Sequence, residues 1–306
     1  MTIEGSIPPL PTPLLDDGEF DEEGLRAIVE FATVNGCGGV VVLGTTGEFP
    51  YFTMEEKRRI LGAAVDQANG RIPVVAGISA FSVKEAAMLG NYAQDVGADY
   101  AIAALPTYYP LEENEIRGFF LDLSQRIEIP LFLYHIPPIT STPFISTQVI
   151  LDLAAEGAIV GMKDSTEDWN GHAKIVLDNA PPNFCLLAGN EPLFFAALDD
   201  GVILPGFICG GGGFAPRHYV TYFENLRAGH IEAAEEALGM IRKIMSLFDI
   251  PIQCMPSMIK EAFRYIGFNI TTVVRPPLPP LLPAHAKKVQ QVLDAGIADG
   301  LVDRYA

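Results

Sequence analysis

The chain has 306 residues, of which 49% are hydrophobic and only 19% are charged. This proportion of apolar side chains can fill a large core and excludes a disordered chain. Asp and Glu outnumber Lys and Arg by 38 to 20, which gives a formal net charge of −18. Because such a chain repels phosphate backbones and anionic lipid surfaces, we expect no nucleic acid and no membrane among its partners.

Cysteine spacing and the length of apolar runs indicate the compartment. The four cysteines show no CxxC spacing: Cys37, Cys185, Cys209 and Cys254. No apolar run reaches the roughly 20 residues that a bilayer crossing needs, and residues 1–15 lack the pattern of a signal peptide. The five histidines form no HExxH or comparable motif. We therefore expect a cytoplasmic protein with reduced thiols and no metal site.

Short β-branched runs alternate along the chain with longer segments of helical periodicity. The runs predict strands at 7–14, 39–43, 72–76, 100–103, 130–134, 159–162, 184–187 and 202–208. The segments between them predict helices near 21–35, 53–65, 82–93, 112–127, 146–156, 168–179, 191–199 and 215–229. Two of these helices begin with the capping-box pattern, at Thr53–Glu56 and at Ser82–Glu85.

Strand–helix pairs in series indicate a parallel sheet, because parallel neighbours need a crossover connection. An open doubly wound sheet would share the pattern, but its usual GxGxxG motif after the first strand is absent. A closed barrel fits the number of pairs and the chain length better. After residue 229 only helical patterns continue, near 230–248, 255–267 and 284–298. We predict an α/β fold, a (β/α)8 TIM barrel over residues 1–228 with a C-terminal helical extension over residues 229–306.

In such a barrel the loops that follow the strands form the active site. Gly44–Glu48 places two hydroxyls between glycines, where backbone N–H groups can approach an anion closely; a plain turn is the alternative. Tyr108 and Tyr134 lie at similar strand ends and could be proton donors or aromatic fillers. Gly210–Gly213 follows the last predicted strand. Barrels often bind phosphate at this position, and a flexible loop is the alternative.

Lys163 ends the sixth predicted strand, directly after an apolar run. A lysine that points into the barrel mouth is desolvated, which favours the neutral amine that can attack a carbonyl and form a Schiff base. The alternative is a lysine that turns outward or pairs with Asp164. The residues alone leave both possibilities open.

Three motifs in this order closely resemble those of the dihydrodipicolinate synthase and N-acetylneuraminate lyase family of class I pyruvate aldolases: Gly44–Glu48, Tyr134–Pro137 and Gly161–Asp164. The resemblance extends over almost the whole chain. It implies a (β/α)8 barrel with C-terminal helices and a homotetramer built as a dimer of dimers. It also implies small-molecule substrates, pyruvate and an aldehyde, with no cofactor and no metal.

The resemblance implies catalytic roles for four residues. Lys163 would form the Schiff base with a 2-oxo acid, and Tyr134 would transfer protons at the substrate. Thr45 would link Tyr134 to Tyr108, which reaches into the site of the neighbouring subunit. The substrate-binding positions that the resemblance implies are Thr46, Gly47, Ile139, Ser165, Gly189, Glu191 and Ile208. Of these, Thr46 and the backbone near Gly47 would hold the carboxylate of the 2-oxo acid, and Ile208 would present its carbonyl.

Ile139 stands where dihydrodipicolinate synthases have an arginine that binds the carboxylate of the aldehyde. An isoleucine cannot make that bidentate contact. The resemblance therefore favours the 2-keto-3-deoxy sugar acid aldolases and the sialic acid lyases, although Pro192 replaces an acidic residue typical of the latter. Dihydrodipicolinate synthase, a sugar-acid dehydratase and a catalytically silent carboxylate-binding protein remain as alternatives.

Overall fold

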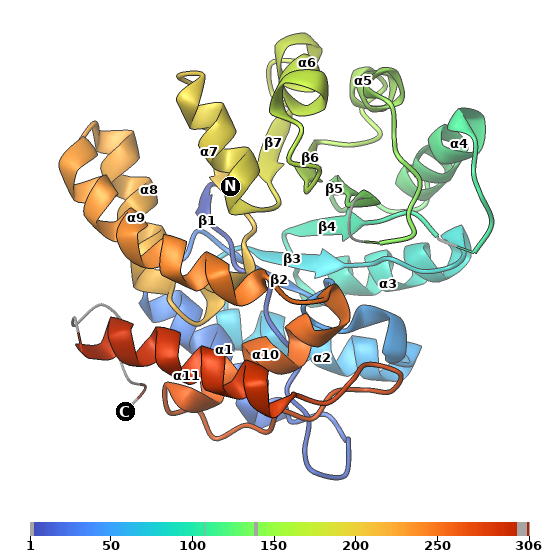
Figure 1. The fold of residues 1–306 in the computed structure, drawn as a ribbon. Coiled ribbons are helices and arrows are strands. Elements are labelled where there is room, and N and C mark those ends of the chain that lie inside the picture. Colours follow the sequence, from blue (N-terminus) through green and yellow to red (C-terminus); the bar gives the residue numbers. More distant parts are fainter. Residues whose placement is uncertain (1–2, 107, 138–139, 299–304, 306) are drawn as a thin grey trace.

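The computed structural model describes residues 3–106, 108–137, 140–298 and 305. Within them, eight parallel strands form one sheet in the order β1-β8-β7-β6-β5-β4-β3-β2. The strands are β1 Gly5–Ser6, β2 Val40–Val42, β3 Val74–Gly77, β4 Tyr100–Ala103, β5 Leu131–His135, β6 Gly161–Asp164, β7 Cys185–Ala188 and β8 Gly206–Phe207. Helices surround this sheet (Figure 1).

The chain after β1 closes the sheet into a barrel. Leu10 N–H donates to the carbonyl of Val41 at 2.8 Å, and Val41 N–H donates to the carbonyl of Pro8 at 3.0 Å. These bonds join the two ends of the strand order, which confirms the predicted (β/α)8 barrel. The first strand is Gly5–Ser6, so the prediction of a strand at 7–14 was wrong. The prolines of that segment have no N–H to donate to a ladder, and the segment makes isolated bridges at Pro9 and Leu14 instead.

The observed helices follow the predicted order and extend past the barrel. They are α1 Glu22–Val34, α2 Met54–Ala68, α3 Val83–Val96, α4 Glu113–Ser124, α5 Thr147–Ala155, α6 Lys174–Asn179, α7 Glu191–Asp199, α8 Pro216–Ala228, α9 Ile231–Met245, α10 Met255–Tyr265 and α11 Pro283–Ala298. Thr53 and Glu56 form the predicted capping box of α2. Ser82 caps α3 by accepting from Glu85 N–H. A π-helical turn, Trp169–Ala173, replaces the first part of the helix predicted at 168–179.

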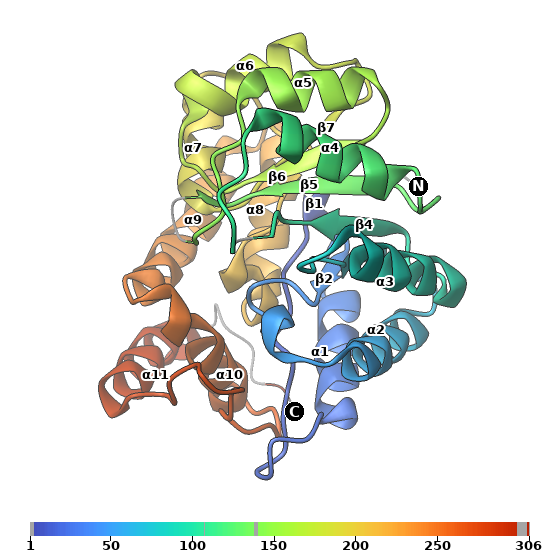
Figure 2. The ribbon, with the colours of Figure 1, turned by 90° about the vertical axis from the view of Figure 1, so that its right-hand side faces the viewer.

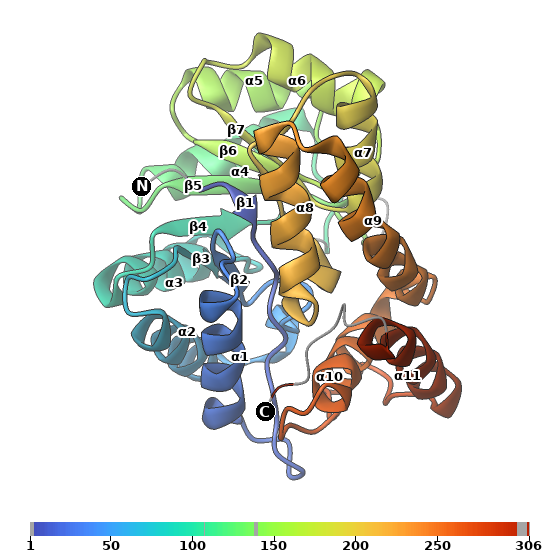
Figure 3. The same cartoon turned by 90° about the vertical axis from the view of Figure 1, so that its left-hand side faces the viewer.

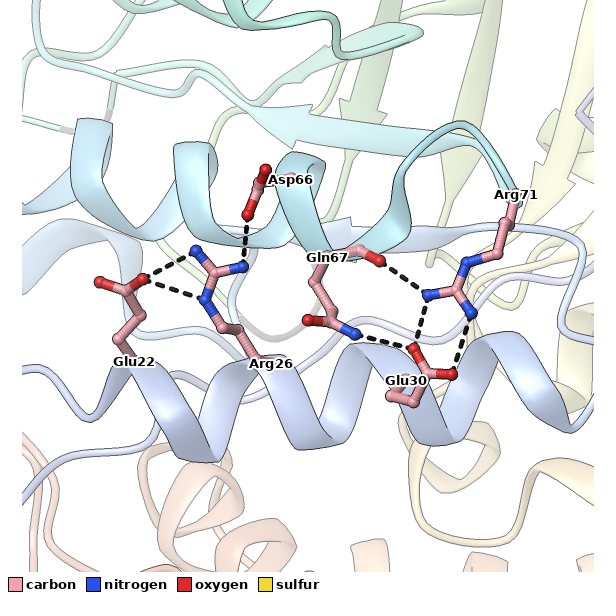
Figure 4. Close-up of polar contacts among 6 residues, drawn as sticks. All are labelled: Glu22, Arg26, Glu30, Asp66, Gln67 and Arg71. Carbon is pink, nitrogen blue, oxygen red and sulfur yellow. Dashed lines mark hydrogen bonds and ion pairs between the residues drawn. The ribbon is translucent and has the colours of Figure 1, made fainter.

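The α1–α2 face carries two exposed groups of ion pairs (Figure 4). Arg26 on α1 contacts Glu22 one turn earlier and Asp66 on α2. Arg71, just after α2, pairs with Glu30 at 2.5 Å and lowers the pKa of that carboxyl to about 2. Since solvent screens such pairs, they align the two helices more than they stabilise the fold.

The C-terminal helices form a layer beside the barrel. Helix α9 packs on α8 and on α11, and α11 packs on α10; Figures 2 and 3 show α9 running from the barrel wall toward α10 and α11. Between α10 and α11 the chain returns to the barrel, where the Thr271 hydroxyl donates to the carbonyl of Leu14 at 2.6 Å. The predicted division at residue 229 stays a prediction.

Two features are absent from the part of the chain that the structure describes. There, no helix is both long and apolar enough to span a bilayer. No three His, Cys, Asp or Glu side chains gather there in a metal-binding arrangement. The four cysteines are all free thiols. The cytoplasmic location stays a prediction.

Candidate active site

The register of β5 and β6 brings a lysine and a tyrosine together. Tyr134 lies opposite Lys163, and its side chain belongs to the cluster inside the barrel. Because side chains alternate along a strand, Met162 packs in the outer layer under the helices and Lys163 points inward. Lys163 is only 6% exposed, and its Nζ donates to the Tyr134 hydroxyl at 3.0 Å.

Asp164 takes the opposite direction, so it does not pair with the neighbouring lysine. Its carboxylate lies 2.9 Å from Nδ1 of His172, and Nε2 of that ring lies 3.0 Å from the carbonyl of Ile145. Both partners can act as acceptors, so the geometry favours a His172 ring with a hydrogen on each nitrogen, which is the positively charged form. Burial disfavours this charge, but the hydrogen bond and the charge of Asp164 outweigh it and raise the pKa of His172.

The loop after β2 supplies the hydroxyls of the site. Thr45 Oγ1 lies 3.5 Å from the Tyr134 hydroxyl, and Thr46 is buried, with 2% of its surface exposed. The carbonyl of Gly47 accepts from the Thr12 hydroxyl at 2.9 Å, which holds the turn against the segment after β1. The predicted anion cradle therefore lies beside the lysine and tyrosine pair.

A cavity of about 570 Å³ opens at the carboxyl ends of the strands. Eight of the predicted site residues line it: Thr45, Thr46, Tyr134, Lys163, Ser165, Gly189, Glu191 and Ile208. Gly47 supports the loop from behind. Tyr108 is 79% exposed and contacts the ring of Tyr109, away from the lysine of its own chain. Ile139 lies outside the described residues.

Glu191 lines this cavity at the start of α7. The Tyr219 hydroxyl donates to its Oε1 at 2.6 Å, and burial raises the pKa of the Glu191 carboxyl. Tyr219 also explains one residue of the glycine run after β8, because a Cβ on Gly211 would lie 2.2 Å from the tyrosine hydroxyl. Gly210–Gly213 is a 3₁₀ helix packed under aromatic rings.

Three charged residues of the cavity wall were not among the predicted site residues. Glu167 follows β6 in the loop that carries Ser165, and the same search of strand ends could have found it. Arg242 and Asp249 come from the C-terminal extension, at α9 and just after it. No motif marks them in the sequence, because the packing of the extension alone brings them to the mouth.

A (β/α)8 barrel whose mouth holds a buried lysine against a tyrosine hydroxyl defines a class of carbon–carbon lyases. The model of the dihydrodipicolinate synthetase family matches residues 2–296, and the chain belongs to this family. The resemblance inferred from the three motifs is thereby confirmed, and the protein is a lyase of that family.

Several proteins show the extent of the similarity. The chain is 33% identical over 299 residues to a 4-hydroxy-tetrahydrodipicolinate synthase of Nitrosospira multiformis, which covers 97% of both chains. It is also 33% identical over 282 residues to the Methanopyrus kandleri enzyme of the same name. This alignment covers 91% of the present chain and 90% of the Methanopyrus protein. The E. coli K12 prophage protein YagE, solved in complex with pyruvate, superimposes with a TM-score of 0.89 at 27% identity. The superposition covers 96% of this chain and 99% of the YagE chain. The dihydrodipicolinate synthase of Aquifex aeolicus superimposes with a TM-score of 0.88 at 29% identity. That superposition covers 99% of this chain and 100% of the Aquifex chain.

Proposed function

We propose that this lyase forms a Schiff base with pyruvate and uses it to cleave or form a 2-oxo-3-deoxy acid. The observation that carries the proposal is the contact of 3.0 Å between the buried Nζ of Lys163 and the Tyr134 hydroxyl. A nucleophilic amine needs a nearby group that can take and return its proton, and the tyrosine hydroxyl is within reach.

In the cleavage direction, the Lys163 amine attacks C2 of the 2-oxo acid and the adduct loses water to give an iminium. Tyr134 gives its own proton to the hydroxyl that leaves as water in this dehydration. The resulting phenolate then takes the proton of the C4 hydroxyl while the iminium draws the electron pair of the C3–C4 bond toward nitrogen, and Tyr134 can return this proton to C3 of the enamine. The aldehyde leaves, the resulting enamine is protonated at C3, and water hydrolyses the imine to release pyruvate. Condensation runs through the same steps in reverse. Neither direction needs a cofactor or a metal.

Binding of the 2-oxo acid follows from the loop after β2. The Thr46 hydroxyl and the backbone near Gly47 can donate to the carboxylate, which places C2 toward Lys163. Thr45, 3.5 Å from the Tyr134 hydroxyl, extends the chain of exchangeable protons. Ile208, next to β8, adds its carbonyl on the far side of the cavity.

The walls of the cavity favour a hydroxylated aldehyde. Ser165, Glu167 and Glu191 line it and offer hydrogen-bond acceptors to hydroxyl groups. The sequence has isoleucine at position 139, where a carboxylate-binding arginine would suit a second acid. These features support a substrate of the 2-keto-3-deoxy sugar acid type.

Dihydrodipicolinate synthase activity is the second candidate, because the similar proteins of Nitrosospira multiformis and Methanopyrus kandleri are named as synthases of this kind. That reaction would condense pyruvate with aspartate semialdehyde. In this cavity Arg242 is the cation that could meet the additional carboxylate. A dehydratase would retain all the carbons of a sugar acid, which product analysis distinguishes.

We also propose that the site is completed by a second copy of the chain. Tyr108 and Tyr109 are exposed, and a second cavity of about 520 Å³ shares Thr45 and Tyr134 with the first. A partner's Tyr108 that entered this second cavity would reach Thr45. The predicted homotetramer supplies such a partner.

Borohydride reduction with excess pyruvate tests the proposed chemistry. Intact and peptide masses should show one pyruvate-derived adduct, confined to Lys163 and absent in Lys163→Ala. A folded protein that gives no adduct would refute the Schiff-base mechanism and favour a silent carboxylate-binding protein. With the adduct established, initial rates with sugar aldehydes and with aspartate semialdehyde separate the two candidates.

A further inference from the structure

Glu48 ends the loop that carries Thr45 and Thr46, yet its side chain does not contact the solvent. The residue is 1% exposed, and its backbone adopts the left-handed conformation at φ 57°. This conformation is unfavourable for any residue other than glycine, so surrounding contacts must hold Glu48 in it. Glu48 lines the second cavity together with Thr45 and Tyr134.

The C-terminal extension supplies those contacts. Lys260 on α10 places its Nζ 2.5 Å from Glu48 Oε1, and both side chains are fully buried. The backbone N–H of Arg275 donates to Oε2 of the same carboxylate at 2.8 Å. Lys260 also donates to the carbonyl of Val273 at 2.5 Å, which ties α10 to the segment that follows it.

Other charged groups near this pair have partners of their own. The Arg275 guanidinium pairs with Glu56, in the first turn of α2, and lies over the Phe52 ring. Lys57 and Glu85 line the second cavity, where they attract each other. Burial and the nearby charge of Arg275 lower the pKa of Lys260, and Glu48 counteracts both effects. The Lys260 ammonium is therefore the cation in direct contact with the Glu48 carboxylate.

The location of the pair matters for an anionic substrate. A carboxylate bound at Thr46 and Gly47 would lie one or two residues along the chain from Glu48. An unpaired negative charge in this buried loop would repel it, because charges interact strongly where water is excluded. With Lys260 in place the two buried charges cancel, and the cradle can accept an anion.

We propose that Glu48 and Lys260 form a positioning pair, which holds the Thr45–Gly47 turn in its anion-binding shape and keeps that turn electrically neutral for the carboxylate of the 2-oxo acid. The pair thereby makes substrate binding in the barrel depend on α10 of the C-terminal extension. This inference rests on the proposed function. It assigns no chemical step to either residue.

The test measures the pyruvate concentration that half-saturates borohydride trapping, together with KM and kcat, in four proteins. They are the wild type, Lys260→Met, the double variant Glu48→Gln/Lys260→Met, and Arg264→Met. Arg264 is the matched control, since it also lies on α10 and pairs with a buried carboxylate, Glu261, at 2.7 Å but has no contact with Glu48 among the described residues. Lys260→Gln replaces Lys260→Met should the latter fail to fold.

Lys260→Met should raise the half-saturating concentration and KM by about tenfold or more, because the charge of Glu48 is left unpaired. The increase should shrink as the pH falls, since a buried carboxylate without its cation takes up a proton. The double variant should recover most of the binding that Lys260→Met loses, without this pH dependence, because it lacks the unpaired charge and its amide can still accept from the Arg275 N–H. Arg264→Met should match the wild type.

Two results would overturn the inference. One is a Lys260→Met protein with wild-type half-saturation. The other is a double variant as impaired as the single one at every pH, which would assign Lys260 to packing alone. A wild-type protein that traps no pyruvate would instead refute the proposed function, and this inference with it.

Discussion

Lys163 and Tyr134 face each other across the neighbouring strands β6 and β5, with Nζ and the tyrosine hydroxyl 3.0 Å apart. Lys163 Nζ also lies 4.1 Å from the centre of the tyrosine ring. Two adjacent strands hold both side chains, so their separation depends on sheet register and not on a loop. Such rigid placement suits a nucleophile and its proton carrier.

Tyr134→Phe should remove the proton carrier while leaving the nucleophile in place. We expect kcat to fall by roughly a hundred- to ten-thousand-fold, the usual contribution of a positioned acid–base group. Borohydride should still trap pyruvate on Lys163, although more slowly. Steady-state rates and adduct masses measure the two effects. The control is Tyr265→Phe, which removes a hydroxyl that contacts Asp294. Equal activity of the two variants would contradict the role of Tyr134.

Much of this site follows from the sequence because it depends on local order. The rule that active-site residues follow barrel strands locates Thr45, Tyr134 and Lys163, and the strand period then places Tyr134 inside the barrel. The same rule does not decide which way Lys163 turns. The inward direction of Lys163 becomes clear only from its pairing with Tyr134 on β5 and from His172, which binds the neighbouring Asp164 on the outer face.

The remaining features depend on contacts between distant segments. Nothing near Glu48 in the sequence indicates that Lys260 will neutralise it, and nothing near Arg242 indicates that α9 will carry it to the cavity. The segment 7–14 was wrongly predicted as the first strand for a different reason. Its apolar pattern is that of a strand, but its prolines cannot donate the hydrogen bonds that define a ladder.

Tyr108 should act in the site of a neighbouring subunit. Lys163→Ala and Tyr108→Phe proteins are expected to be nearly inactive separately. After subunit exchange in a one-to-one mixture, about a quarter of wild-type activity should return, because mixed pairs contain one site with an intact lysine and an intact partner tyrosine. Exchange is verified by native mass spectrometry. No recovery in exchanged oligomers would show that Tyr108 does not act in trans.

His172 should make the stability of the fold depend on pH. Its pKa is raised in the folded state, so its contribution is complete below the unfolded pKa and is lost as the pH rises through the folded one. His172→Gln breaks a buried ion pair and should cost about 3 kcal/mol near pH 6, with a smaller loss near pH 9. Urea unfolding at both pH values measures this. His230→Gln changes an exposed histidine and should have little effect at either pH. An equal loss at both pH values would contradict a buried imidazolium.

Gly211→Ala should destabilise the protein through the residue that holds Glu191. The added methyl would lie 2.2 Å from the Tyr219 hydroxyl and 2.6 Å from Ile244 Cγ2, so these side chains must shift. We expect a loss of about 1–3 kcal/mol, as for other overpacked cores. Tyr219 donates to Glu191, so its displacement should also alter KM for the aldehyde more than the trapping of pyruvate.

The matched control for Gly211→Ala is Gly239→Ala in α9, where a Cβ meets nothing within 4 Å. Alanine in a helix interior is favoured over glycine by roughly 0.5–1 kcal/mol, so this variant should be as stable as the wild type or more so. Thermal and urea unfolding compare the two substitutions directly. If both variants were equally stable, the glycine run after β8 would not be required by the packing of Tyr219, and the position of Glu191 would need another explanation.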